Sequence, residues 1–185
     1  MKLSRLALTA YLVAIVIIVV DQITKAWILG ALDMLTASGA LIDRELWGGR
    51  SISIIEPILR FSFVLNDGVS FGLFGGGAGR WILSVFSIAV SGVLAWWALR
   101  SDRKLLTAAI GLVMGGALGN VIDRIRFGGV VDFLDFSGTG LFPWVFNVAD
   151  SAISIGVALL ILDGVWADRR KPKPSTLVGD APEMS

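Results

Sequence analysis

The chain has 185 residues, of which 55% are hydrophobic and 17% are charged, and its mean hydropathy is +0.79. This balance favours a single-domain membrane protein and leaves no room for a large soluble module. There is no cysteine and no histidine, and the formal net charge is +1. These values exclude disulfides, cysteine or histidine metal ligands and an imidazole base, and they offer no global charge for nucleic acid.

Four apolar segments are long enough to cross a bilayer, which takes about 20 residues in a helix. They cover approximately residues 6–29, 81–99, 105–122 and 148–165. The basic residues Lys2 and Arg5 ahead of the first segment also fit a cleaved signal peptide. No small-x-small cleavage site follows and three further spans do, so we expect a retained helix.

Basic residues predict the orientation of these helices. They gather before the first span, between the second and third spans, and after the fourth, whereas the connections at about 30–80 and 123–147 are nearly balanced in charge. Positive flanks mark the cytoplasmic side, so we expect both termini in the cytoplasm and both of these connections outside. Residues 1–168 are then one membrane domain and 169–185 a polar cytoplasmic tail.

The expected fold class is an all-α membrane protein with four transmembrane helices and a small β-containing periplasmic subdomain between the first two. Residues 58–65 are rich in β-branched and aromatic types, which predicts a strand or hairpin closed by a turn at Asn66-Asp67-Gly68. Residues 31–47 are read as an interfacial helix.

Acidic and amide side chains from three spans converge on the predicted outer layer of the membrane. They are Asp21, Asn120, Asp123, Asn147 and Asp150, with the basic Arg124 beside Asp123 and with Asp132 and Asp135 in the short loop between the third and fourth spans. Ionisable groups at bilayer depth are costly unless paired or hydrated, so this clustering indicates a functional site. Asp132 and Asp150 have no adjacent cation in sequence and are the strongest candidates.

The other polar residues also fit simple structural roles. Asp21 and Lys25 are spaced i, i+4, which fits an ion pair with Lys25 reaching the headgroups. Asp123 beside Arg124 fits mutual neutralisation, Asn66 with Gly68 fits a turn, and Asp163 fits pairing with Arg169 and Arg170 near the inner surface. The tryptophans lie mostly at span ends, as in an aromatic belt.

Five short motifs in order on this topology resemble the lipoprotein signal peptidase family, also called signal peptidase II or prolipoprotein signal peptidase. The motifs are Asp21-Gln22-x-x-Lys25, Asn66-x-Gly68-x-x-Phe71, Gly119-Asn120-x-x-Asp123-Arg124, Val131-Asp132-Phe133 and Phe146-Asn147-x-Ala149-Asp150. Each motif alone is weak, but together they extend over residues 21–155.

The resemblance implies a bacterial inner-membrane aspartic endopeptidase with its site near the periplasmic face. It would cut the signal peptide from diacylglyceryl-modified prolipoproteins just before the lipidated cysteine, as a monomer, without metal or other cofactor and without nucleic acid. It would contact membrane lipids and bind cyclic-peptide inhibitors of the globomycin type. The resemblance implies Asp132 and Asp150 as the catalytic pair. It implies binding or supporting roles for Asn66, Gly68, Asn120, Asp123, Arg124, Asn147, Asp21 and Lys25.

The sequence departs from this family in two places. The segment between Lys25 and Asn66 is longer than usual, with an apparent insertion near 38–53, and Val69-Ser70 replaces the usual pair of alanines. We expect the second change to leave activity intact.

Two carboxylates at a partly dry site share one proton, which supplies a base and an acid together. A proton-coupled transporter remains an alternative, and it would place acids at several depths. A noncatalytic assembly factor is another, with the glycines of the third span as a helix-packing face.

Overall fold

The computed structural model describes residues 4–48, 50–68, 78–140 and 142–169. Within these residues the chain forms four long helices, α1 (Arg5–Ala31), α2 (Ala78–Ala98), α3 (Lys104–Phe127) and α4 (Val148–Arg169). All four are long and apolar enough to span a membrane. The four predicted spans are confirmed, and α3 continues five residues beyond its predicted end at 122. The predicted tail at 170–185 lies outside the described residues.

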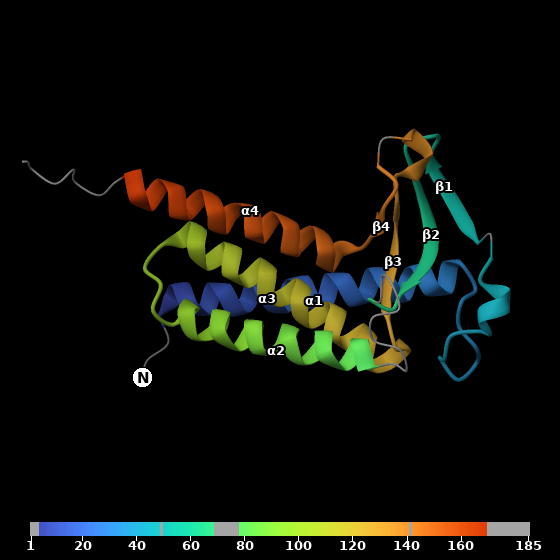
Figure 1. Ribbon diagram of the computed structural model, residues 1–185, viewed down its shortest axis with the longest axis horizontal. Helices are drawn as coiled ribbons and strands as arrows, with labels where there is room; N and C mark the ends of the chain where they lie inside the picture. The colour runs from blue at the N-terminus through green and yellow to red at the C-terminus, as the bar shows by residue number, and fades with distance from the viewer. Residues whose placement is uncertain (1–3, 49, 69–77, 141, 170–185) are drawn as a thin grey trace, which may run out of the picture.

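Helix α3 is the centre of the bundle, because it packs against each of the other three helices (Figure 1). In the most apolar 18-residue stretch of α3, 72% of the residues are buried, against 22% in the corresponding stretch of each other helix. Glycines allow this close packing: a Cβ on Gly111 would lie 2.6 Å from the Ala10 carbonyl oxygen, and one on Gly115 would lie 2.7 Å from that of Ala14. The predicted packing role of these glycines is confirmed.

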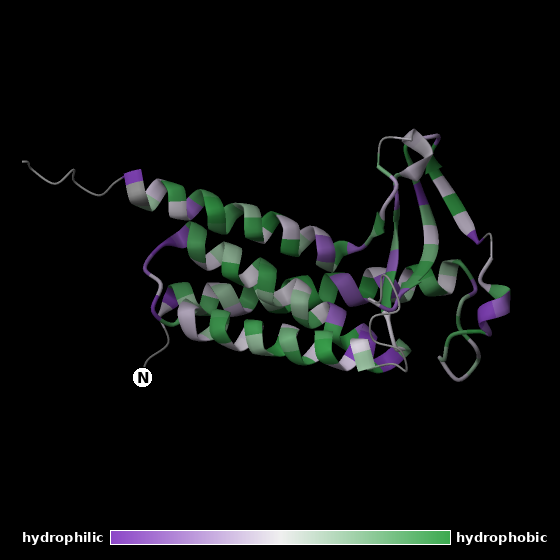
Figure 2. Cartoon of the chain, viewed as in Figure 1, coloured by the Kyte–Doolittle hydropathy of each residue, from purple (hydrophilic) through white to green (hydrophobic). Residues whose placement is uncertain are grey.

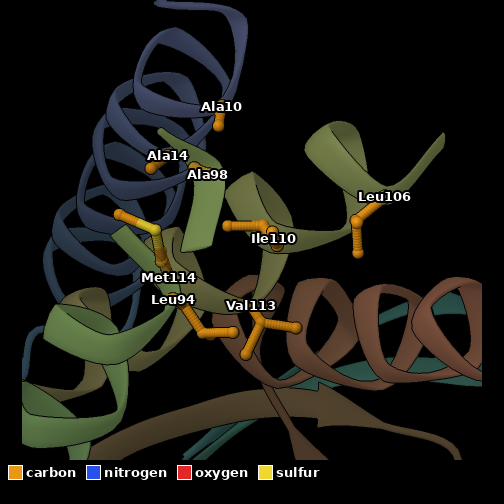
Figure 3. Close-up of a cluster of buried hydrophobic side chains, with 8 residues drawn as sticks. All are labelled: Ala10, Ala14, Leu94, Ala98, Leu106, Ile110, Val113 and Met114. Atoms are coloured by element: carbon orange, nitrogen blue, oxygen red, sulfur yellow. The ribbon is translucent and has the colours of Figure 1, made fainter. Parts of the chain in front are cut away.

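Small and branched side chains fill the space between α1, α2 and α3. Figure 3 shows this cluster of eight side chains, in which Ala10 and Ala14 lie beside Ile110 and Met114. The helices α1, α2 and α4 carry exposed large apolar side chains. Hydrophobic residues, green in Figure 2, recur along these helices. Such a surface is unfavourable in water and suits contact with lipid. The chain is thus a multi-pass membrane protein.

An antiparallel sheet lies across one end of the bundle, opposite the end where α1 begins and α4 ends (Figure 1). Its order is β1 (Ser51–Ile55), β2 (Leu59–Asn66), β3 (Val130–Asp135) and β4 (Val145–Phe146). The first two strands confirm a β-containing segment between the first two helices. The interpretation of 130–135 as part of a loop is wrong, since both connections contribute strands to one sheet.

The predicted strand at 58–65 is confirmed as β2, and the predicted turn at Asn66-Asp67-Gly68 is present, but this turn does not close the β1–β2 hairpin. The β1–β2 hairpin closes at Glu56-Pro57-Ile58, and Asn66 instead ends β2 at the bundle. Proline suits such a turn because its φ is already restricted. As a result the carboxyl end of β2, and not the hairpin tip, points to the helices.

The expected interfacial helix at 31–47 is not present. Helix α1 ends at Ala31, a bridge pairs Leu35 with Leu41, and a single 3₁₀ turn covers Arg44–Leu46. Just beyond the helix end Asp33 has a positive φ of 53°, and further on a turn follows in which Gly39 has a φ of 78° and the Thr36 amide donates to the Ala40 oxygen at 2.8 Å. This region includes most of the apparent insertion.

A second apolar cluster fixes the sheet on α1. Ile28 and Leu29 pack with Phe63 of β2 and with Val131 and Phe133 of β3. This contact places the middle of β3 directly against the end of the bundle. The side of the membrane on which the sheet lies, and the single-domain division of the chain, stay predictions.

Candidate active site

Asp132 and Asp150 come from different elements and meet at the junction of sheet and bundle. Asp132 lies in β3 opposite Val64 of β2, and Asp150 lies in the first turn of α4. Asn147 joins them: its side-chain nitrogen donates to Asp132 Oδ1 at 2.7 Å, and its backbone nitrogen lies 3.3 Å from Asp150 Oδ2. The two strongest candidates from the sequence are therefore neighbours.

Local sequence explains how Asp150 is positioned. The Asn147 side-chain oxygen accepts a hydrogen bond from the Asp150 amide at 2.9 Å, while the Asp150 carboxylate accepts one from the Asn147 amide. This reciprocal cap satisfies donors that a helix start leaves open, and the positive end of the helix dipole favours a carboxylate there. Asn120 of α3 donates to Asp150 Oδ1 at 2.8 Å.

Asn66 forms the turn that its sequence context suggested, and it also contacts Asp132. Its oxygen accepts from the Gly68 amide at 3.0 Å, and Gly68 has a φ of 75°, a conformation that glycine adopts without strain. Its side-chain nitrogen donates to Asp132 Oδ2 at 3.1 Å. The turn thus aims Asn66 at Asp132. Val69, Ser70 and Phe71 lie outside the described residues.

Lys25 is buried beneath this pair, with 2% of its surface exposed. Its Nζ lies 2.8 Å from carboxylate oxygens of both Asp21 and Asp123, which are each 0% exposed. The interpretation of Lys25 as reaching the headgroups is therefore wrong. Pairing of Asp123 with Arg124 is also wrong, because successive side chains on a helix point in different directions.

Arg124 lies in the last turn of α3, beside these acids. Its charge interacts with the carboxylates of Asp150, Asp123 and Asp132. Within the described part of the chain its buried Nε has no hydrogen-bond partner, and no acid lies within ion-pair distance. A buried unpaired donor is uncommon in folded proteins and suits a site that receives a ligand acceptor.

Burial, followed by the nearby charge of Asp150, raises the pKa of Asp132 to about 7. Hydrogen bonds from Asn66 and Asn147 oppose this shift but do not cancel it. Asp132 is 2% exposed, and its two donors are neutral amides, so its charged form has little compensation. At neutral pH a proton is readily held at this position.

Beside Asp150 lies a cavity of about 310 Å³ with mostly apolar walls. Phe142, Trp144 and Phe146 line one side and Ser154 and Ile155 of α4 the other. The sequence reasoning missed this feature, because it assigned Trp144 to an aromatic belt. The signal was the dense aromatic run just before the motif that contains Asp150.

Gln22 is a second residue that the sequence reasoning left without a role. Its side-chain nitrogen donates to Asp123 Oδ1 at 2.9 Å and lies 3.3 Å from the Gly119 oxygen. Its place between Asp21 and Lys25 in the first motif was the available signal.

Asp163 is also paired differently from the prediction: its partner is Arg103 at 2.6 Å, not Arg169, and Arg170 lies outside the described residues. In the described part of the chain, no cluster of three or more acidic side chains is placed to hold a metal ion.

Comparisons with known proteins identify the family. A family model described as signal peptidase II matches residues 13–166. The chain belongs to the signal peptidase II family. It is 46% identical to a lipoprotein signal peptidase of Caulobacter vibrioides over 173 residues, covering 92% of this chain and 95% of that protein. It is 46% identical to one of Methylobacterium radiotolerans over 133 residues, covering 70% and 78% of the two chains.

Solved structures share this fold. One, described as a bacterial membrane enzyme, superposes with a TM-score of 0.67 at 28% identity, covering 89% of this chain and 93% of that one. Membership of the signal peptidase II family implies a peptidase, and the polar junction described above is its candidate active site.

Proposed function

We propose that this chain is an aspartic endopeptidase of the bacterial inner membrane that cleaves prolipoproteins. Its substrates carry diacylglycerol on a cysteine, and cleavage removes the signal peptide just before that residue. The observation that carries this proposal is the convergence of Asp132 and Asp150 on Asn147, in a chain whose curated relatives are lipoprotein signal peptidases. With both termini cytoplasmic, the pair lies near the periplasmic face.

The environments of the two aspartates give them different roles. Asp150 is less buried and sits at a helix start, where the Asn147 amide and the Asn120 side chain donate to its carboxylate and the helix dipole favours a negative charge. Asp132 is more deeply buried and its raised pKa of about 7 favours the protonated form. Asp150 is therefore the base that takes a proton from water, and Asp132 is the acid.

The reaction then follows from these two protonation states. Water that has lost a proton to Asp150 attacks the scissile carbonyl, while the Asp132 proton stabilises the oxyanion that develops. The pair afterwards delivers a proton to the leaving amine. Arg124, whose Nε has no acceptor among the described residues, holds the peptide backbone together with the asparagines, since an unpositioned amide loses most of the advantage of proximity.

The aromatic cavity beside Asp150 suits the apolar part of such a substrate. Its walls are carbon-rich, and the proposed base Asp150 is one of the residues that line it. The acyl chains remain in lipid during the reaction, so this contact orients the substrate more than it adds hydrophobic binding energy. The same cavity would accept a cyclic-peptide inhibitor of the globomycin type.

The transporter alternative finds less support in the described helices. It needs ionisable groups at several depths along a path. Asp163 lies away from the junction, and Arg103 already neutralises it at 2.6 Å. The assembly-factor alternative explains the close packing of α3 but gives no reason for a buried Asp132 and a partly buried Asp150 that meet on neutral amide donors.

Cleavage of a diacylglyceryl-modified prolipoprotein in detergent tests the proposal. The wild type should cleave it, and Asp132→Asn and Asp150→Asn should each lower kcat by roughly a thousandfold or more. Ordinary activity in both variants would eliminate the proposed chemistry. A folded wild type that never cleaves would favour the alternatives.

A further inference from the structure

The peptide amides just before the two proposed catalytic aspartates are each held by a buried carboxylate. The Val131 amide, which precedes Asp132, donates to Asp123 Oδ2 at 3.0 Å. The Ala149 amide, which precedes Asp150, donates to Asp21 Oδ1 at 2.9 Å. Each aspartate is thus attached to a peptide unit that another helix holds in place.

One ammonium group joins these two carboxylates. Lys25 Nζ lies 2.8 Å from Asp21 Oδ2 and 2.8 Å from Asp123 Oδ2. It also donates to Asn120 Oδ1 at 3.2 Å, and the other end of the Asn120 amide bonds to Asp150. These contacts connect β3 to α4 through the buried Lys25 cation, in addition to the loop between them and the Asn147 side chain, which bonds to Asp132.

We propose that Lys25 is a positioning residue that sets the separation of Asp132 and Asp150 through Asp21 and Asp123. This proposal rests on the proposed function. Two carboxylates share a proton only while they remain close. As the pair separates, the difference between its two apparent pKa values becomes smaller. Loosening the Lys25 cluster should therefore change the chemical step and its pH dependence, but not substrate binding.

A purely structural ion cluster predicts something different. Loss of its charges would lower the stability of the fold. Any electrostatic effect on Asp132 and Asp150 would shift the apparent pKa values of both limbs of the pH profile in the same direction. Removing the Lys25 cation would raise both apparent pKa values, and removing the Asp123 charge would lower both. Loss of positioning instead reduces the difference between the two apparent pKa values, whether the Lys25 cation or the Asp123 charge is removed.

The bundle contains a matched control at its opposite end. Asp163 of α4 is 6% exposed and pairs with Arg103 at 2.6 Å. This pair also joins two segments through buried charge, but it holds neither amide that precedes a proposed catalytic residue. Asp163→Asn should lower the unfolding temperature while leaving kcat and the pH limbs unchanged.

The experiment measures kcat, KM and pH profiles for Lys25→Met and Asp123→Asn in the full-length protein in detergent. Lys25→Met leaves two buried carboxylates without a cation and can therefore destabilise the fold. Asp123→Asn is the milder second variant, because its side-chain oxygen can still accept the hydrogen bond from the Val131 amide. We expect kcat to fall about 10- to 100-fold with KM within about twofold, and the two limbs to converge.

Three outcomes are distinguishable. Converging limbs in either folded variant, with Asp163→Asn unchanged, support the positioning role. Parallel shifts, or activity lost only in proportion to unfolded protein, overturn it while leaving the proposed function intact. A folded wild type that cleaves no prolipoprotein overturns both.

Discussion

Two aspartates three residues apart on β3 show how the partners of a carboxyl group decide whether burial raises its pKa. Asp132 is 2% exposed and Asp135 is 3% exposed. Burial acts to raise the pKa of both. Asp135 receives hydrogen bonds from Ser137, Arg60 and Ser62, and together these hold its pKa well below the usual range. Asp132 receives only neutral amides and faces Asp150, so its pKa rises to about 7.

This difference separates a structural acid from a proposed catalytic one. Arg60 Nε lies 2.6 Å from Asp135 Oδ2, and the Ser62 hydroxyl lies 2.7 Å from the same oxygen. Those contacts fix the charge of Asp135 and join β2 to β3. Asp132 lacks a cation partner of this kind, so a reaction can use its proton.

The largest expected effect comes from exchanging each acid for its amide. Asp132→Asn should lower kcat by roughly a thousandfold or more, because it removes the proposed acid. Asp135→Asn should leave kcat within a few-fold, because Asp135 lies at the other end of the strand, beside Arg60. Cleavage assays on folded protein measure both, and equal losses would contradict the division between them.

The pH dependence of cleavage should follow Asp132. Its proton is present below a pKa of about 7 and is lost above it. We expect kcat to fall about tenfold per pH unit on the alkaline side once that proton is gone. An alkaline limb that survives unchanged in the residual activity of Asp132→Asn would assign it to another group.

Stability should respond to the two acids with opposite signs. The raised pKa of Asp132 favours the folded state at low pH, and this contribution is lost as pH rises from the ordinary value of 3.8 through about 7. The lowered pKa of Asp135 favours the folded state above 3.8, and its contribution is lost as pH falls below that value. Thermal unfolding between pH 4 and 8 should therefore show a decline that Asp132→Asn removes and Asp135→Asn retains.

Removal of the Arg60 cation should have a moderate effect on stability. Arg60→Met leaves the buried Asp135 carboxylate without its charged partner, but the Arg60 side chain is 47% exposed, so solvent already weakens the pair. We expect a loss of about 1–3 kcal/mol at neutral pH, with kcat nearly unchanged. Denaturant unfolding measures the loss, and a large drop in kcat without unfolding would contradict it.

The smallest expected effect is that of Ser62→Ala. It removes one hydrogen bond to Asp135, which leaves Arg60 and the Ser137 amide in place. We expect a loss of about 1 kcal/mol in unfolding free energy and no change in cleavage. A loss as large as that of Arg60→Met would mean that the hydroxyl, and not the cation, stabilises Asp135.

The sequence predicted the four helices because a bilayer imposes a length and an apolar composition that few other segments meet. It also placed the polar residues at one level, since orientation and span length fix the depth of each. Asp132 and Asp150 stood out for lack of a neighbouring cation. These inferences use only short-range information and geometry along a helix axis.

The pairings across the fold were beyond such reasoning. Asp123 lies beside Arg124 in sequence but binds Lys25, which lies on another helix, and Asp163 binds Arg103 in a loop. The strand at 130–135 escaped prediction because its partner strand is far away in the chain. Sequence spacing does not reveal which side chains face each other once α3 occupies the centre of the bundle.

Infrared difference spectroscopy on the pH titration tests the central claim most directly, because a protonated buried carboxyl group has its own carbonyl absorption. The wild type should show such a band at pH 6 that disappears as pH rises through about 7, the pKa of Asp132, and Asp132→Asn should lack it. Asp135→Asn should retain the band. A band that persists in Asp132→Asn, or a wild type with no protonated carboxyl near neutral pH, would contradict the assignment of Asp132 as the acid of the pair.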